Sequence, residues 1–130
     1  MNYLLDTSAL LFWLEGSKRF TKAVKNELVR PANQVYVSAV SAFEIAVKAS
    51  LKRLTLPEPP AKLLPPFFIA SGLTTLPVTM EHSFGVYALP PHHTDPFDRL
   101  LLSQALCEDM TIVSSDRAFA AYSVNLVLLK

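Results

Sequence analysis

Short apolar runs alternate along this chain with segments of helical periodicity, and this alternation constrains the fold more than any other feature. The expected strands cover residues 3–6, 35–38, 73–76, 111–114 and 125–128. The expected helices cover residues 8–15, 21–30, 41–51, 80–88 and 96–108, with a short one near 117–122. Strands that are separated by helices favour an α/β fold with a mainly parallel sheet.

The length of the chain and the position of its prolines bear on the domain organisation. Half of the ten prolines fall in the segment "LTLPEPPAKLLPPFF", residues 54–68. We expect this segment to be a stiff connection with room for one helical turn, because too little of the 130-residue chain lies on either side for two cores. The sequence therefore predicts a single domain, residues 1–130.

Composition bears on partners and location. The chain is 51% hydrophobic and only 18% charged, which predicts that some apolar surface meets a partner, most simply a second copy of the chain. No apolar run reaches the roughly 18 residues of a membrane span, and Asp6 interrupts the apolar amino terminus. Cys107, the one cysteine, is expected to be a small buried hydrophobe. We therefore expect a cytoplasmic homodimer that does not associate with a membrane.

Four acidic residues fall where the expected strands end or the expected helices begin. Asp6 and Asp116 each follow a strand. Glu44 lies in the first turn after the strand "VYVS", and Asp98 lies in the first turn of the helix over residues 96–108. In an open parallel sheet the carboxyl ends of the strands and the amino ends of the following helices share one edge, where ligands bind. We therefore expect the four carboxylates to face one crevice.

Each of these acids also has a local explanation. Ser41 and Glu44 have the spacing of a capping box. Asp95, which is followed by a proline at the first helical position, is a candidate N-cap, and Asp98 can complement the helix dipole. The two strand-end acids can accept hydrogen bonds from nearby backbone amides. Capping, however, does not require four acids on the same edge of a sheet.

The charge of such a cluster indicates a cation. Two like charges about 4 Å apart repel by roughly 4 kcal/mol at an effective dielectric constant of about 20, so four carboxylates are costly together unless a cation neutralises them. Carboxylate oxygens without cysteine or converging histidine suit Mg²⁺ or Mn²⁺ better than zinc. Such ions activate water and neutralise charge on a phosphoryl group during in-line attack, which predicts phosphodiester hydrolysis.

The basic residues are compatible with a polyanionic substrate. The formal net charge is +1, and setting aside the four acids, each of charge −1, leaves +5 on the rest of the chain. Lys48 and Lys52 lie four and eight residues after Glu44, on roughly the same helix face, and they are candidates for contacts with the phosphates of such a substrate. Arg53 and Arg117 lie near the same edge and are further candidates. The alternative is a helical pair between Glu44 and Lys48 and solvated surface for the others.

Three blocks of the sequence carry a resemblance to a known family. They are "YLLDTSALLFWL" at the amino terminus, "VSAVSAFEIAVK" in the middle and "LPPHHTDPFDRLLLSQALCEDMTIVSSD" near the end. Together they resemble the signature blocks of PIN-domain ribonucleases, in particular the toxin subunits of bacterial VapBC-type toxin–antitoxin pairs. The resemblance implies a three-layer α/β/α sandwich that cuts RNA with Mg²⁺ or Mn²⁺ and is held inactive by a small antitoxin.

The resemblance also implies roles for individual residues. The residues that take the places of the family's acids, and would be both catalytic and metal-ligating, are Asp6, Glu44, Asp98 and Asp116. Asp95 and Arg99 belong to the local motif around the third acid and are expected to support it. Ser114 keeps a hydroxyl where threonine is frequent, and Phe43 stands where tryptophan is common. A glycine that is frequent after the glutamate helix is missing from "KASLKRL", so the pattern does not fix the end of that helix.

Two other functions are compatible with the residues. Aspartyl-phosphate chemistry, as in haloacid-dehalogenase-like phosphatases, would use Asp6 as the nucleophile. That family requires a second aspartate two residues later, where this chain has Ser8. A non-catalytic α/β binding module would use the acids only as caps, and it predicts no thermal stabilisation by millimolar Mg²⁺.

The histidines and the aromatic residues of the first helix have simpler explanations. His92 and His93 lie beside prolines and are expected to be loop residues rather than general bases. His82 is expected to be a surface or cap residue at the start of its helix. Phe12 and Trp13 are expected to pack in the core or at a partner interface.

Overall fold

The centre of the molecule is a five-stranded parallel sheet. A computed structural model describes residues 1–130, and its strands lie in the order β3-β2-β1-β4-β5. They are β1 (Asn2–Leu5), β2 (Gln34–Ser38), β3 (Leu73–Leu76), β4 (Thr111–Ser114) and β5 (Leu126–Leu128). All four pairings are parallel. The predicted α/β class is therefore confirmed, and the sheet is parallel throughout rather than only mainly so.

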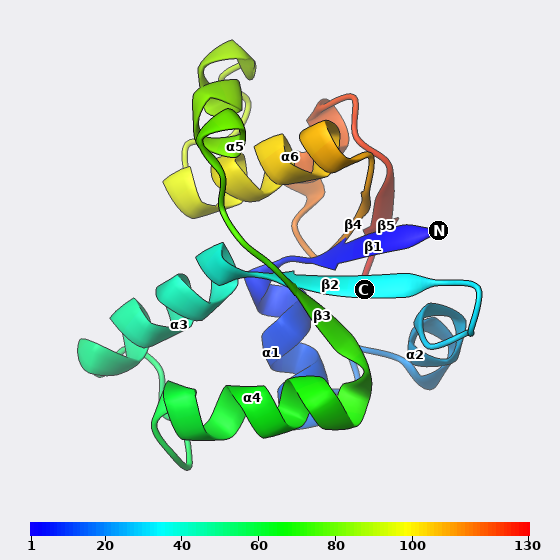
Figure 1. The fold of residues 1–130 in the computed structure, drawn as a ribbon, viewed down its shortest axis with the longest axis vertical. Coiled ribbons are helices and arrows are strands. Elements are labelled where there is room, and N and C mark those ends of the chain that lie inside the picture. Colours follow the sequence, from blue (N-terminus) through cyan, green and yellow to red (C-terminus); the bar gives the residue numbers. More distant parts are fainter.

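Helices cover both faces of this sheet (Figure 1). One layer contains α1 (Thr7–Glu15), α2 (Lys22–Leu28) and α4 (Pro60–Ser71). The opposite layer contains α5 (Met80–Gly85) and α6 (Pro96–Glu108). The remaining elements are α3 (Ala39–Ser50), which follows β2, and the short 3₁₀ helices η1 (Val86–Ala88) and η2 (Arg117–Ala121). This arrangement confirms the expected three-layer α/β/α sandwich.

Strand side chains alternate between two apolar cores, one on each face of the sheet. Leu5 and Val113 pack in the first core together with Trp13 of α1. Leu4 and Ile112, which are their neighbours in the chain, pack in the second core. A parallel sheet that is covered on both faces buries successive residues of each strand, and its strands therefore read as continuous apolar runs. The core position of Trp13 agrees with one of the two places expected for it.

The proline-rich segment differs most from the expectation. Residues 54–68 do not form a stiff connection with one helical turn, because the twelve-residue helix α4 begins within them. Pro65 and Pro66 lie inside this helix, where each removes a backbone hydrogen bond. Leu64 is buried, and Phe67 packs against the first core. Tertiary packing of the apolar face therefore outweighs the local cost of the prolines.

The start of α3 also differs from the expectation. The helix begins two residues earlier than predicted, and Ser38 is its N-cap. Ser41 lies inside the helix, buried, where its hydroxyl accepts a hydrogen bond from Thr7 Oγ1 at 3.0 Å. The predicted capping box of Ser41 and Glu44 is therefore wrong, and Glu44 lies in the second turn rather than the first.

Two smaller expectations are corrected as well. The helix expected over residues 80–88 divides into α5 and η1. Cys107 is exposed rather than buried, as are its neighbours in the last turn of α6. None of the helices combines the length and the apolar composition that crossing a membrane requires.

The end of α3 leads to a prediction about stability. After the helix ends at Ser50, Lys52 adopts the left-handed conformation with φ of 59°. A side chain destabilises this conformation by roughly 1–2 kcal/mol, whereas glycine adopts it readily but loses more backbone entropy on folding. We expect Lys52→Gly to raise the free energy of unfolding by about 0.5–1 kcal/mol in urea denaturation. Lys52→Ala, which keeps the strained conformation, is the control, and an equal gain from it would disprove the explanation.

Candidate active site

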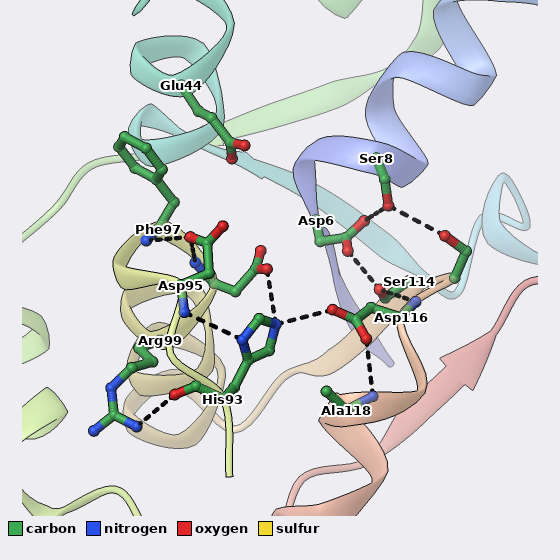
Figure 2. Close-up of polar contacts among 12 residues, drawn as sticks. Asp6, Ser8, Glu44, His93, Asp95, Phe97, Arg99, Ser114, Asp116 and Ala118 are labelled. Atoms are coloured by element: carbon green, nitrogen blue, oxygen red, sulfur yellow. Dashed lines mark hydrogen bonds and ion pairs between the residues drawn. The ribbon is translucent and has the colours of Figure 1, made fainter. Parts of the chain in front are cut away.

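A polar cavity of about 270 Å³ lies at the carboxyl edge of the sheet. Its walls come from the residues that follow β1 and β4 and from α1, α3 and α6. The structure thus brings together the four acids that the sequence singles out, although they are far apart in the chain. Figure 2 labels three of them, Asp6, Glu44 and Asp116. The residues that line the cavity are Asp6, Thr7, Ser8, Leu11, Glu44, Lys48, Asp95, Asp98, Ser115 and Asp116.

Asp6 connects the end of β1 to the start of α1. Its Oδ1 accepts hydrogen bonds from the backbone N–H of Ala9 at 2.8 Å and from Ser8 Oγ at 3.0 Å, and its Oδ2 accepts one from Ser114 Oγ. Figure 2 shows the two bonds from the serines. Asp6 is only 3% exposed. Burial raises the pKa of this carboxyl group, although the hydrogen bonds lower it. Asp6 is therefore the N-cap of α1 and, at the same time, a poorly solvated residue that lines the pocket.

Ser114 connects two of the acids. Its hydroxyl donates to Asp6 and accepts a hydrogen bond from the backbone N–H of Asp116 at 2.9 Å. Asp116 in turn caps η2, because its Oδ1 accepts a hydrogen bond from the backbone N–H of Ala118 at 2.9 Å. These contacts give a physical basis to the supporting role predicted for Ser114, whose hydroxyl keeps the loop after β4 against the end of β1.

Glu44 reaches the pocket from α3. Its Oε2 accepts a hydrogen bond from Lys48 Nζ at 2.5 Å, so the helical pair that the sequence allows is present. This bond to Glu44 is the main reason why the pKa of Lys48 is raised. The other oxygen, Oε1, is buried and has no hydrogen-bond partner. A buried carboxylate oxygen without a partner is costly unless something else binds it.

Asp95 and Asp98 divide two roles at the start of α6. Asp95 is the N-cap, as predicted, because its Oδ1 accepts hydrogen bonds from the backbone N–H groups of Phe97 at 2.8 Å and Asp98 at 3.2 Å. Asp98 faces the pocket. Burial and, after it, the charges of Asp95 and Asp6 raise the pKa of Asp98 to about 7, while His93 opposes the rise. The negative charge of Asp98 is therefore unfavourable without a proton or a cation.

An aromatic contact holds the two acid-bearing helices together. Phe43 of α3 packs on Phe97 of α6 with ring centroids 5.9 Å apart. Each ring is the chain neighbour of a pocket acid, Glu44 or Asp98. The phenylalanine that replaces the more common tryptophan therefore still makes an aromatic contact beside the site.

His93 is the residue of the site that sequence reasoning missed. It lies in a loop, as expected, but its Nε2 is 3.0 Å from Asp98 Oδ2 and 2.9 Å from Asp116 Oδ2. His93, Asp98 and Asp116 each offer a potential ligand atom within 4.8 Å of the others. The available signal was the position of His93 two residues before the helix cap Asp95, in a turn bounded by prolines.

Arg99 supports the loop that carries His93 and does not face the pocket. Its guanidinium donates hydrogen bonds to the carbonyl oxygens of Val86, Leu89, Pro90 and His93 at 3.1–3.2 Å. Five donors in a planar fork suit this arrangement, which a lysine cannot reproduce. The supporting role predicted for Arg99 thus has a structural explanation.

The other predicted residues lie at different distances from the pocket. Lys48 lines it, but Lys52, Arg53 and Arg117 are exposed outside it. The structure therefore brings one of the four predicted phosphate contacts into the pocket wall. Lys52 instead lines a separate cavity between α3 and the start of α4.

The remaining histidines lie outside the site. His82 is a cap residue, which is one of the two roles expected for it, because it completes a capping box with Thr79 at the start of α5. It is buried rather than at the surface, and its Nε2 lies 3.0 Å from Glu108 Oε1. His92 is an exposed loop residue whose ring packs against Tyr122, 5.2 Å away between centroids.

The donor atoms of the pocket fit a divalent cation. The unpartnered Oε1 of Glu44 is a buried ligand atom, and the raised pKa of Asp98 shows that this carboxylate gains from a nearby positive charge. The donors are carboxylate oxygens, which Mg²⁺ and Mn²⁺ prefer. The arrangement can therefore bind a hard cation and present it to an anionic substrate.

A three-layer sandwich with a carboxylate pocket at the carboxyl edge of its sheet defines an α/β protein with a candidate cation site. The chain belongs to the PIN domain family, whose sequence model matches residues 3–125. The resemblance inferred from the three sequence blocks is thereby confirmed.

One relative in sequence and two solved structures resemble this chain. The chain is 28% identical over 120 residues to Ribonuclease VapC22 of Mycobacterium tuberculosis, covering 92% of this chain and 90% of the relative. Its fold is similar to a chain of VapBC2 from Rickettsia felis bound to a promoter DNA fragment, with a TM-score of 0.76, 18% identity and 100% coverage of both chains. It is also similar to a chain of DNA-bound VapBC from Salmonella typhimurium, with a TM-score of 0.72, 15% identity and coverage of 98% and 97%.

Proposed function

We propose that this protein is a metal-dependent endoribonuclease and the toxin subunit of a toxin–antitoxin pair. The observation that carries the proposal is the convergence of Asp6, Glu44, Asp98 and Asp116 on one pocket in which a glutamate oxygen is buried without a partner. The similarity to a relative named as a ribonuclease supports RNA as the substrate. The family membership supports a nuclease.

The four acids would hold Mg²⁺ or Mn²⁺, and the surroundings of Asp6 and Glu44 orient these two carboxylates for it. A bound cation supplies positive charge that neutralises the scissile phosphate and polarises the attacking water. Hydrogen bonds from Ser8, Ala9 and Ser114 fix the orientation of Asp6. Lys48 fixes one oxygen of Glu44 and leaves the other free.

Other residues would bind and orient the RNA. Lys48 contributes a positive charge at the pocket wall, with its side chain 46% exposed, so its ammonium group can also meet a phosphate. Lys52, Arg53 and Arg117 are exposed and remain candidates for phosphate contacts of a longer RNA.

Asp98 must lose its proton before it can hold a cation, because a protonated carboxyl group is a poor ligand.

Cleavage of total RNA by the purified protein tests the proposal directly. We expect Mg²⁺ or Mn²⁺ to support cleavage, excess EDTA to abolish it, and mapping of the new ends to reveal a preferred site. Cleavage that persists in excess EDTA contradicts the proposal. So does the absence of cleavage with both Mg²⁺ and Mn²⁺. Trapping of a phosphorylated Asp6 would instead support aspartyl-phosphate chemistry, which Ser8, in place of the second aspartate that this chemistry requires, disfavours.

The partners are proposed on the same basis. We propose a small antitoxin as the inhibiting partner, supported by the similarity in fold to chains of VapBC complexes.

The homodimer and the cytoplasmic location stay predictions. Met80, Phe84 and Tyr87 on α5 and η1 are exposed apolar residues that a second copy of the chain would cover. Light scattering of the purified chain measures its oligomeric state.

The raised pKa of Asp98 predicts how the effect of metal on stability depends on pH. Between about pH 4, where an unfolded aspartate titrates, and about 7, the folded protein holds a proton that the unfolded chain has released. The stability of the metal-free protein therefore falls as the pH rises through this window. A cation that replaces the proton should raise the melting temperature more at pH 8 than at pH 5.

Melting scans with and without millimolar Mg²⁺ across this range measure the effect. The Asp98→Asn variant, which has no proton to lose at this position, should lose the part of the pH dependence that Asp98 contributes, while the part due to Asp6 remains. A non-catalytic module whose acids serve only as caps would show no stabilisation by Mg²⁺ at any pH.

A further inference from the structure

We propose that His93 is a positioning residue of the site, whose ring donates a hydrogen bond to the carboxylate of Asp116 and contacts that of Asp98, and that it is not a ligand of the cation. The inference rests on the proposed function. It goes further because it assigns a role to a residue that neither the sequence blocks nor the four-acid arrangement explains.

The backbone of Asp95 determines which nitrogen of His93 carries the proton. The N–H of Asp95 donates a hydrogen bond to Nδ1 of His93 at 3.2 Å. A nitrogen that accepts a hydrogen bond must present its lone pair, so the proton of the neutral imidazole lies on Nε2. A protonated ring nitrogen has no lone pair for a metal ion. His93 therefore fits a donor, although its distances to Asp98 and Asp116 would also allow a ligand.

The protonated nitrogen is placed between the two carboxylates. Nε2 makes a hydrogen bond of 2.9 Å to Asp116 Oδ2 (Figure 2), and Asp98 Oδ2 lies 3.0 Å from the same nitrogen. The contact with Asp98 involves only one oxygen of that carboxylate, Oδ2. Asp116 is held at both oxygens, since Ala118 donates to its Oδ1. His93 thus fixes the rotation of the Asp116 carboxylate, lies against Oδ2 of Asp98 and leaves the other oxygen of Asp98 for a cation.

The position of His93 is itself held from three directions. Its backbone N–H donates to Tyr122 Oη at 2.8 Å, and its carbonyl oxygen accepts a hydrogen bond from Arg99 at 3.1 Å. Tyr122 Oη also donates to the carbonyl oxygen of Pro90 at 2.8 Å. The ring packs against Phe119 with centroids 5.8 Å apart. A residue that only filled space in a loop would not need this number of specific contacts, whereas orientation of metal ligands depends on such support.

Mn²⁺ binding to the metal-free protein, followed by electron paramagnetic resonance, tests the inference without relying on activity. We expect His93→Ala to weaken Mn²⁺ binding roughly tenfold or more, the range typical of lost partners of metal ligands. His93→Gln, whose amide can donate from a similar position, should recover part of the affinity. His92→Ala, which changes the neighbouring exposed histidine, is the matched control and should bind like the wild type.

Pulsed electron paramagnetic resonance of the bound Mn²⁺ decides whether His93 is a hydrogen-bond donor or a ligand of the ion. The inference predicts no directly coordinated nitrogen in the wild-type protein. Circular dichroism verifies folding, and if His93→Ala does not fold, His93→Leu replaces it, because leucine fills the space of the ring without offering a donor.

The outcomes separate this inference from the proposed function. A wild-type protein that binds no Mn²⁺ overturns both. Wild-type binding that His93→Ala leaves unchanged overturns only the role of His93. A coordinated nitrogen that disappears in His93→Ala overturns the donor role and makes His93 a ligand.

Discussion

The Asp98→Asn variant is expected to fold and to lose metal-stimulated RNA cleavage by at least about 100-fold, because charge stabilisation of this kind contributes several kcal/mol to a transition state. Asparagine keeps the size of the side chain but offers a weak, neutral ligand. Without metal the variant should be as stable as the wild type, or more stable near neutral pH. The reason is that the surroundings of Asp98 already favour its neutral form, raising its pKa to about 7.

Initial rates of RNA cleavage at saturating Mg²⁺ or Mn²⁺ measure this effect, and melting scans verify the fold. Asp109→Asn is the matched control. It removes the same charge from the other end of α6, at a C-cap with φ of 54° that asparagine also tolerates. The control should cleave RNA like the wild type. Equal rates for Asp98→Asn and the wild type would end the assignment of Asp98 to the reaction.

The Arg99→Lys variant is expected to lose about 3 kcal/mol of stability although the charge is kept. The guanidinium of Arg99 donates to four carbonyl oxygens, and a single ammonium group cannot reach all of them. Each partly buried acceptor that is left unpaired costs about 1–3 kcal/mol. For a chain of this length the loss corresponds to a fall in melting temperature of roughly 10 °C.

Thermal and urea denaturation measure the effect, and Arg117→Lys is the control. Arg117 is exposed, so its replacement should change stability by less than about 0.5 kcal/mol. Arg99→Lys should also weaken Mn²⁺ binding, because Arg99 holds the carbonyl oxygen of His93. An unchanged melting temperature would show that the loop does not depend on the guanidinium.

The elements with local signals were predictable from the sequence. The bounds of α6 match the expected residues 96–108, because Asp95 and Pro96 specify its start through capping and a fixed φ. The strands were recognisable as continuous apolar runs, since both faces of the sheet are covered. The order of strands and helices then placed Asp6 and Asp98 on the same edge, because parallel strands end there.

The elements with misleading local signals depended on tertiary contacts. Pro65 and Pro66 argue against a helix, yet α4 forms because Leu64 and its apolar neighbours pack against the sheet. Ser41 and Glu44 have capping-box spacing, yet Ser38 caps the helix. The local cost is about 3 kcal/mol or more for each proline inside a helix and about 1 kcal/mol for a lost cap, and burial of several apolar side chains can exceed both.

By itself, the sequence determined the α/β class, the parallel sheet and the edge at which the four acids lie, because strand pattern and chain order decide these properties. Only the tertiary structure decided that Glu44 keeps a buried oxygen without a partner and that His93 joins the site. The position of His93 depends on contacts with Arg99 and Tyr122, residues that lie 6 and 29 positions further along the chain. A loop conformation held by such distant partners leaves no periodic pattern in the sequence.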